Sequence, residues 1–136
     1  MSNSRHVRVA AVIDVVAVVA FVIIGRKNHD EGSALSGIVK VAAPLLIALA
    51  LGWLAARAWK SPMAVATGIV IWLVTIIAGL ALRKVAFDGG AALPFIIVAS
   101  LFNLATLVGW RCIAEWRADR AARAPDQGPS PLPPGV

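Results

Sequence analysis

The stretch that decides the fold of this protein is VRVAAVIDVVAVVAFVIIGRKNHDEG, residues 7–32. Its first nineteen residues, 7–25, form a hydrophobic run that has one acid, Asp14, inside it, and a polar block begins directly afterwards at Arg26. A run of this length approaches the roughly 20 residues that a helix needs to cross the hydrocarbon of a bilayer. It exceeds the roughly 7–15 residues of a signal-peptide core, and no small-residue cleavage site precedes the polar block. We therefore predict a retained transmembrane helix.

Three further apolar runs are long enough to span a membrane, at residues 38–56, 63–82 and 91–108, and we extend the last span to residue 112. The chain of 136 residues is 60% hydrophobic and only 15% charged, whereas a soluble domain carries about 25% charged residues. Backbone groups in lipid must be hydrogen-bonded internally, so the spans are expected to be helices. The predicted fold class is all-α, a polytopic membrane protein with four transmembrane helices joined by short connections.

The predicted domains are a four-helix transmembrane domain at residues 1–116 and a tail at residues 117–136. The tail begins as a basic helix end and continues as a Pro-rich segment that is expected to be disordered. One cysteine, Cys112, excludes an internal disulfide, and no Cys/His cluster has metal-ligand spacing. We accordingly expect no metal and no cofactor.

The net charge of +6 does not indicate nucleic-acid binding, because the basic residues lie at the ends of hydrophobic runs. In such places they act as topology signals and as contacts for anionic lipid headgroups, so the expected partner is the lipid bilayer. With the N-terminus inside, eight of the thirteen Lys and Arg residues fall on the inner side and five on the outer side. This bias predicts a multi-pass protein of the cell (inner) membrane with both termini in the cytoplasm.

The two halves of the chain align without gaps at an offset of 57 residues (83 − 26). This alignment predicts two tandem two-helix hairpins, related by a pseudo-twofold axis along the membrane normal. The repeated Trp residues lie at helix ends, where they fit an interfacial aromatic belt; a ligand platform is the alternative. The matched pairs are Arg26/Arg83, Lys27/Lys84, Gly32/Gly89, Gly52/Gly109, Trp53/Trp110 and Trp59/Trp116.

Asp14 is the main candidate for chemistry. A carboxylate inside a membrane span is costly when it faces lipid, so it usually faces the bundle interior. Its helical neighbours Ala10, Ala11 and Ala17 make a small-residue face of the kind that packs against another helix. We expect Asp14 to point into the bundle, either as a proton- or cation-binding carboxylate or as part of a structural ion pair.

Arg57 and Arg111 are the candidate partners, because both fall near the same predicted inner ends as Asp14. Asp14 aligns with Ile71 in the second hairpin, and Arg57 aligns with Ala114, so neither charge has a counterpart at the 57-residue offset. Two opposite charges that break the repeat near one membrane face predict an Asp14–Arg57 pair.

Two other polar groups are weaker candidates. In the fourth span, Ala99, Asn103, Thr106 and Trp110 recur at helical spacing as a mildly polar stripe, which fits helix packing with interhelical hydrogen bonds or a substrate path. At the outer side, a metal or an anionic headgroup is one interpretation of the basic and acidic loop residues, and solvated loop charge is the other. The outer candidates are Arg26, His29, Asp30 and Arg83.

Several motifs resemble a bacterial family of small membrane proteins, domain of unknown function 3054. The resemblance covers about residues 8–116, and it implies a four-helix integral membrane protein without an established activity. No catalytic residue can be transferred from it. The residues that carry it are Gly25-Arg26-x-x-His29-x-x-Gly32, Pro44, Gly52-Trp53-Leu54-x-x-Arg57, Thr67-Gly68, Trp72, Thr75 and Gly109-Trp110-Arg111.

The function expected from the sequence is a non-enzymatic accessory or assembly component of the membrane, with a second copy or another membrane protein as partner. The alternative is a small oligomeric proton-coupled transporter that uses Asp14. In size, helix count and an acid in the first helix, the chain is similar to small multidrug-resistance exporters. It differs from them because it has no Tyr and because its predicted repeat is parallel.

Overall fold

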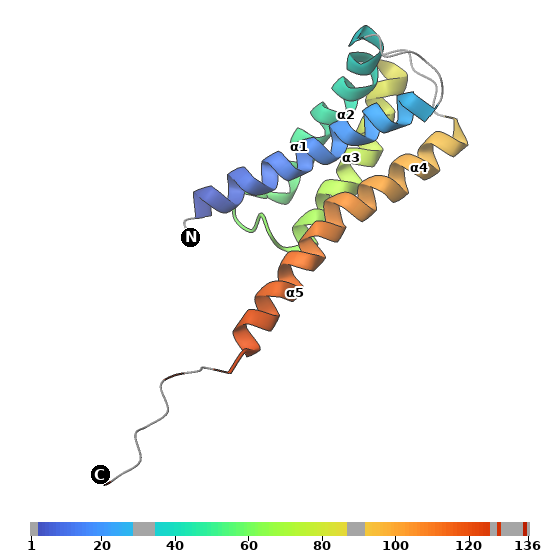
Figure 1. Ribbon diagram of the computed structural model, residues 1–136. Helices are drawn as coiled ribbons and strands as arrows, with labels where there is room; N and C mark the ends of the chain where they lie inside the picture. Colours follow the sequence, from blue (N-terminus) through green and yellow to red (C-terminus); the bar gives the residue numbers. More distant parts are fainter. Residues whose placement is uncertain (1–2, 29–34, 87–91, 126–127, 129–134, 136) are drawn as a thin grey trace.

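The computed structural model describes residues 3–28, 35–86, 92–125, 128 and 135, and all regular secondary structure in them is helical (Figure 1). Four helices are long and apolar enough to cross a membrane, and the last of them is continuous through α4, η1 and α5. The predicted all-α class with four candidate spans is therefore confirmed. The elements are α1 (Asn3–Asn28), α2 (Leu35–Ala56), α3 (Val65–Val85), α4 (Leu93–Asn103), the π-helical turn η1 (Leu104–Val108) and α5 (Gly109–Arg123).

The four spans pack as a ring in which each helix lies beside two others. Helix α1 contacts α2 and α4, while α3 contacts the same two helices, and the α2–α3 pair is the most extensive. Within the described residues, α1 makes no close backbone contact with α3, and α2 makes none with α4, so these pairs are diagonal. Figure 1 shows α5 running on beyond the other helices toward the C-terminus.

The α2–α3 pair is close because glycines lie in its interface. A Cβ added at Gly52 would lie 3.0 Å from the carbonyl oxygen of Ile71, and one at Gly79 would lie 2.8 Å from Leu45 Cδ2. Small residues let helix backbones approach in this way, which favours association in lipid, where burial of apolar surface gives no driving force. Elsewhere in the bundle, Phe21 of α1 packs against Phe95 and against Phe102, with ring centroids 5.9 Å and 5.4 Å apart.

The outer surface of the bundle is apolar on every span. A soluble monomer rarely exposes such continuous apolar surface, whereas lipid-facing helices require it. Exposed side chains of this kind include Val12, Val16, Ile47, Leu54, Ile77 and Leu101.

The π-helical turn η1 determines which residues of the fourth span face the core. The buried residues of this span are spaced by four, at Ala99, Asn103, Leu107 and Arg111. In a regular α-helix each four-residue step overshoots a full turn by about 40°, so such residues drift off one face. The wider i→i+5 turn removes this drift. The predicted stripe continued from Asn103 through Thr106 and Trp110, which are half-buried, whereas the fully buried residues beyond Asn103 are Leu107 and Arg111.

Side chains of α1 and α5 bond the α2–α3 connection, residues 57–64, and the first residue of α3. Asn3 Nδ2 of α1 donates to the carbonyl oxygen of Trp59 at 2.9 Å, and the Val65 N–H donates to Glu115 Oε1 of α5 at 2.9 Å. The Glu115 carboxylate thus lies at the N-terminus of α3, where the helix dipole favours negative charge. Arg57 begins the connection in the left-handed region, with φ of 48°, and it is exposed.

Candidate functional site

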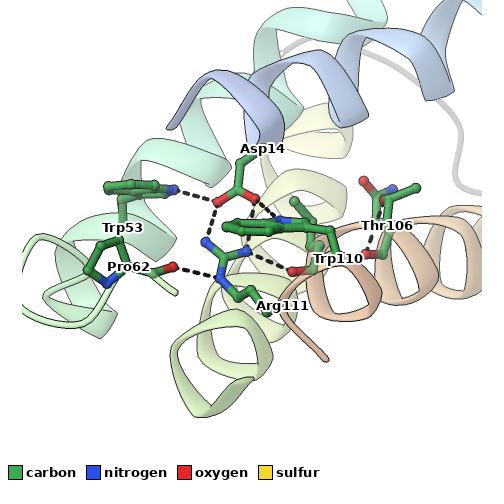
Figure 2. Close-up of polar contacts among 8 residues, drawn as sticks. Asp14, Trp53, Pro62, Thr106, Trp110 and Arg111 are labelled. Carbon is green, nitrogen blue, oxygen red and sulfur yellow. Dashed lines mark hydrogen bonds and ion pairs between the residues drawn. The ribbon is translucent and has the colours of Figure 1, made fainter. Parts of the chain in front are cut away.

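Asp14 of α1 and Arg111 of α5 form an ion pair inside the bundle, and both side chains are fully buried. The pair is bidentate: Arg111 Nη1 donates to Asp14 Oδ1 at 2.9 Å, and Arg111 Nη2 donates to Oδ2 at 2.7 Å (Figure 2). Parallel hydrogen bonds of this type fix the orientation of both groups as well as adding charge-assisted strength. The pair therefore ties the first span to the last.

Two tryptophans complete the environment of the carboxylate. Trp53 Nε1 of α2 donates to Asp14 Oδ2 at 3.0 Å, and Trp110 Nε1 of α5 donates to Oδ1 at 2.9 Å. Figure 2 shows the two indoles approaching Asp14 together with the guanidinium. Each carboxylate oxygen thus accepts one hydrogen bond from the arginine and one from an indole. We call Asp14, Arg111, Trp53 and Trp110 the Asp14–Arg111 cluster.

Two further donors of Arg111 are directed to backbone oxygens. Its Nε donates to the carbonyl of Pro62 at 2.9 Å, and its Nη1 also donates to the carbonyl of Leu107 at 2.7 Å. The guanidinium carbon lies 4.4 Å from the Trp110 ring centroid, within the range of a cation–π interaction. Gly68 of α3 leaves the space for the stem, because a Cβ there would lie 2.7 Å from Arg111 Cδ.

The chemistry of the Asp14–Arg111 cluster follows from the hydrogen bonds that occupy the Asp14 carboxylate. The two opposite charges neutralise each other, and both oxygens of the carboxylate are already bonded to protein donors. Burying either charge alone is strongly unfavourable, whereas a paired and fully hydrogen-bonded set can be accommodated. Side chains of α1, α2 and α5 meet in the cluster, and α3 packs beside it because Gly68 leaves room for the Arg111 side chain.

The predicted Asp14–Arg57 pair is wrong. Asp14 is bonded to Arg111, while Arg57 is exposed in the α2–α3 connection and is not among the donors to the carboxylate. The prediction that Asp14 points into the bundle agrees with its full burial. Arg111, the second candidate partner, reaches Asp14 because η1 carries it to the buried face.

Asn103 and Thr106, the other predicted intramembrane candidates, bond to their own helix instead of the cluster. Asn103 Nδ2 donates to the carbonyl of Ala99 at 2.8 Å, and Thr106 Oγ1 donates to the carbonyl of Phe102 at 2.9 Å. Such bonds to preceding carbonyls compete with the regular helix ladder. The Thr106 bond lies within the segment where the ladder widens to the π-helical turn.

The outer candidates divide between the described residues and those outside them. Arg26 at the end of α1 and Arg83 at the end of α3 line one cavity of about 440 Å³. The Arg83 guanidinium carbon lies 4.2 Å from the ring centroid of Phe95. His29 and Asp30 lie outside the residues that the structure describes.

The role of the two tryptophans is the part of the site that the sequence did not predict. Their position at helix ends is typical of interfacial residues, and that interpretation left the indole N–H groups without a stated partner. Trp53 and Trp110 instead bond Asp14, while Trp59 and Trp116 are exposed. The signal in the sequence was the equal spacing of Gly52-Trp53 and Gly109-Trp110 in two helices near one unmatched acid.

A comparison with protein-family models gives a match to "Protein of unknown function (DUF3054)" over residues 11–114. This range contains every residue of the Asp14–Arg111 cluster. No curated protein gives a significant match, and no solved structure does.

Proposed function

Because this chain belongs to the family described as protein of unknown function (DUF3054), we propose its role from its geometry: it is a non-enzymatic, multi-pass accessory or assembly component of the cell (inner) membrane. In this proposal the Asp14–Arg111 cluster is structural. The observation that carries it is the saturation of Asp14, whose two oxygens accept four hydrogen bonds from within the protein. These four bonds fill the roughly four acceptor sites of the carboxylate, so this arrangement leaves none for a proton or a cation.

The proposed arrangement is two tandem hairpins with both termini in the cytoplasm. A twofold axis along the bundle would exchange α1 with α3 and α2 with α4, and these are the diagonal pairs of the observed ring. Further support comes from two matched pairs of the alignment. Trp53 and Trp110 donate to one carboxylate, and Arg26 and Arg83 line one cavity.

The accessory role predicts a stoichiometric membrane-protein partner. Crosslinking in intact cells, followed by purification in a gentle detergent, should recover that partner with the tagged protein in a fixed ratio. Proton and cation flux into liposomes that contain the purified protein should equal that of protein-free liposomes. A flux that is present in the parent and abolished by Asp14→Asn, in protein that still folds, would replace this proposal with the transporter.

The proposed orientation predicts that Cys112 is on the cytoplasmic side. Cys112 is exposed and directly follows Arg111 in α5, and in the proposed topology it lies at the cytoplasmic end of the last span. We expect an impermeant maleimide to leave it unlabelled in intact cells and to label it in inverted membrane vesicles. A Cys112→Ser protein gives the background in both preparations. Efficient labelling of intact cells would reverse the topology.

A further inference from the structure

A partly open cavity of about 440 Å³ lies at the end of the bundle opposite the Asp14–Arg111 cluster. Its volume is within the roughly 300–1,000 Å³ that is typical of small-molecule sites. Helices α1, α2, α3 and α4 all contribute to it, because α1 and α3 end here and α4 begins here. The lining residues are Phe21, Val22, Gly25, Arg26, Val41, Arg83, Ala92, Pro94, Phe95 and Val98.

The lining combines two cations with an apolar wall. Arg26 and Arg83 are its charged members, and the described part of the chain contributes no acidic residue to it. Arg83 lies over Phe95, and both arginines make a further interaction within the protein. A Cβ at Gly37, where α2 begins, would collide with the Arg26 guanidinium, so this glycine leaves space for it.

The apolar part of the lining leads from the core to the surface of α4. Phe21 and Val22 are almost fully buried, whereas Pro94 and Val98 are exposed, with Val98 at 57%. The cavity therefore opens beside the start of α4, on the surface that faces lipid in a spanning helix. A ligand that enters here meets both apolar side chains and the two cations of the lining.

We propose that this cavity binds an anionic phospholipid, with its phosphate beside Arg26 and Arg83 and one acyl chain along Phe21, Phe95 and Val98. Arginine suits phosphate because its planar donors bond two oxygens at once. The apolar wall distinguishes this ligand from a free phosphate ion, which would leave that wall uncovered. The inference does not depend on the accessory role, because a transporter could hold the same lipid.

The test is lipid binding by the delipidated full-length protein in detergent, measured by native mass spectrometry. The probes are dioctanoyl-phosphatidylglycerol, which is anionic, dioctanoyl-phosphatidylcholine, which has no net charge, and glycerol phosphate, which has no acyl chain. We expect the anionic lipid to bind about tenfold more tightly than the other two, and Arg26→Gln with Arg83→Gln to weaken it about tenfold.

The matched control is Lys84→Gln, which removes the same charge one residue from Arg83 at an exposed position outside the cavity lining. It should leave the affinity unchanged. Val98→Trp keeps both arginines and places bulk at an exposed edge of the cavity, so it should weaken binding even if the arginine variants fail to fold. Equal affinity for the two lipids, glycerol phosphate binding as tightly as the anionic lipid, or equal loss in Lys84→Gln would each overturn the proposal.

Discussion

Asp14→Asn is expected to lower the free energy of unfolding in mixed micelles by about 3–5 kcal/mol, the typical cost of removing one partner of a buried ion pair. The change leaves the Arg111 cation without a counter-charge in a site where it is fully buried. It also replaces one acceptor oxygen by an NH₂ group, which would face two of the four donors that now point at the carboxylate. Titration with SDS, followed by circular dichroism, measures the effect.

The double variant Asp14→Leu, Arg111→Leu separates pairing from other effects of the mutations. If the two charges stabilise the bundle through each other, the double variant should lower the free energy of unfolding by less than the sum of the two single changes. The difference, which is the coupling energy, should be at most about 3 kcal/mol. The matched control is Arg57→Gln, which should change stability by less than about 0.5 kcal/mol because Arg57 is exposed and lies outside the cluster. Additive costs for Asp14 and Arg111, or coupling of Asp14 to Arg57, would contradict the observed pair.

The helices could be predicted from the sequence because lipid imposes a simple rule. Every backbone group in the hydrocarbon must be bonded within its own segment, so a long apolar run becomes a helix regardless of its neighbours. The inward direction of Asp14 could also be predicted from the bilayer, because a carboxylate that faces lipid is costly. The three alanines beside Asp14 mark the face of the helix that packs against its neighbours. Burial of Asp14 agrees with this reasoning.

The partner of Asp14 could not be predicted, because it depends on a local change in helix geometry. Leu54 and Arg111 are equivalent at the 57-residue offset, yet Leu54 is 62% exposed and Arg111 is fully buried. The π-helical turn η1 lies just before Arg111, and an inserted residue there rotates all that follows by about 100°. Hydropathy does not reveal such a turn. From the sequence alone, Arg57 was therefore favoured as the partner of Asp14, because it has no charged counterpart at the 57-residue offset.

The second large effect is expected at Gly52, which sets the distance between α2 and α3. A Cβ there would lie 3.0 Å from the Ile71 carbonyl oxygen and 3.1 Å from its Cα, so an alanine meets backbone that cannot rotate away. The helices must separate, and the looser packing along the most extensive interface should cost about 1–3 kcal/mol. Unfolding of Gly52→Ala in the same mixed micelles measures this cost.

Gly109→Ala is the matched control, because Gly109 aligns with Gly52 at the 57-residue offset and a Cβ there meets nothing within 4 Å. Both changes gain the same helix propensity, about 1 kcal/mol, so the difference between them isolates the close contact. Gly79→Ala should fall between the two, because its Cβ would meet the flexible end of Leu45. If all three variants have equal stability, close backbone approach does not hold α2 against α3, and the remaining force between them is side-chain packing.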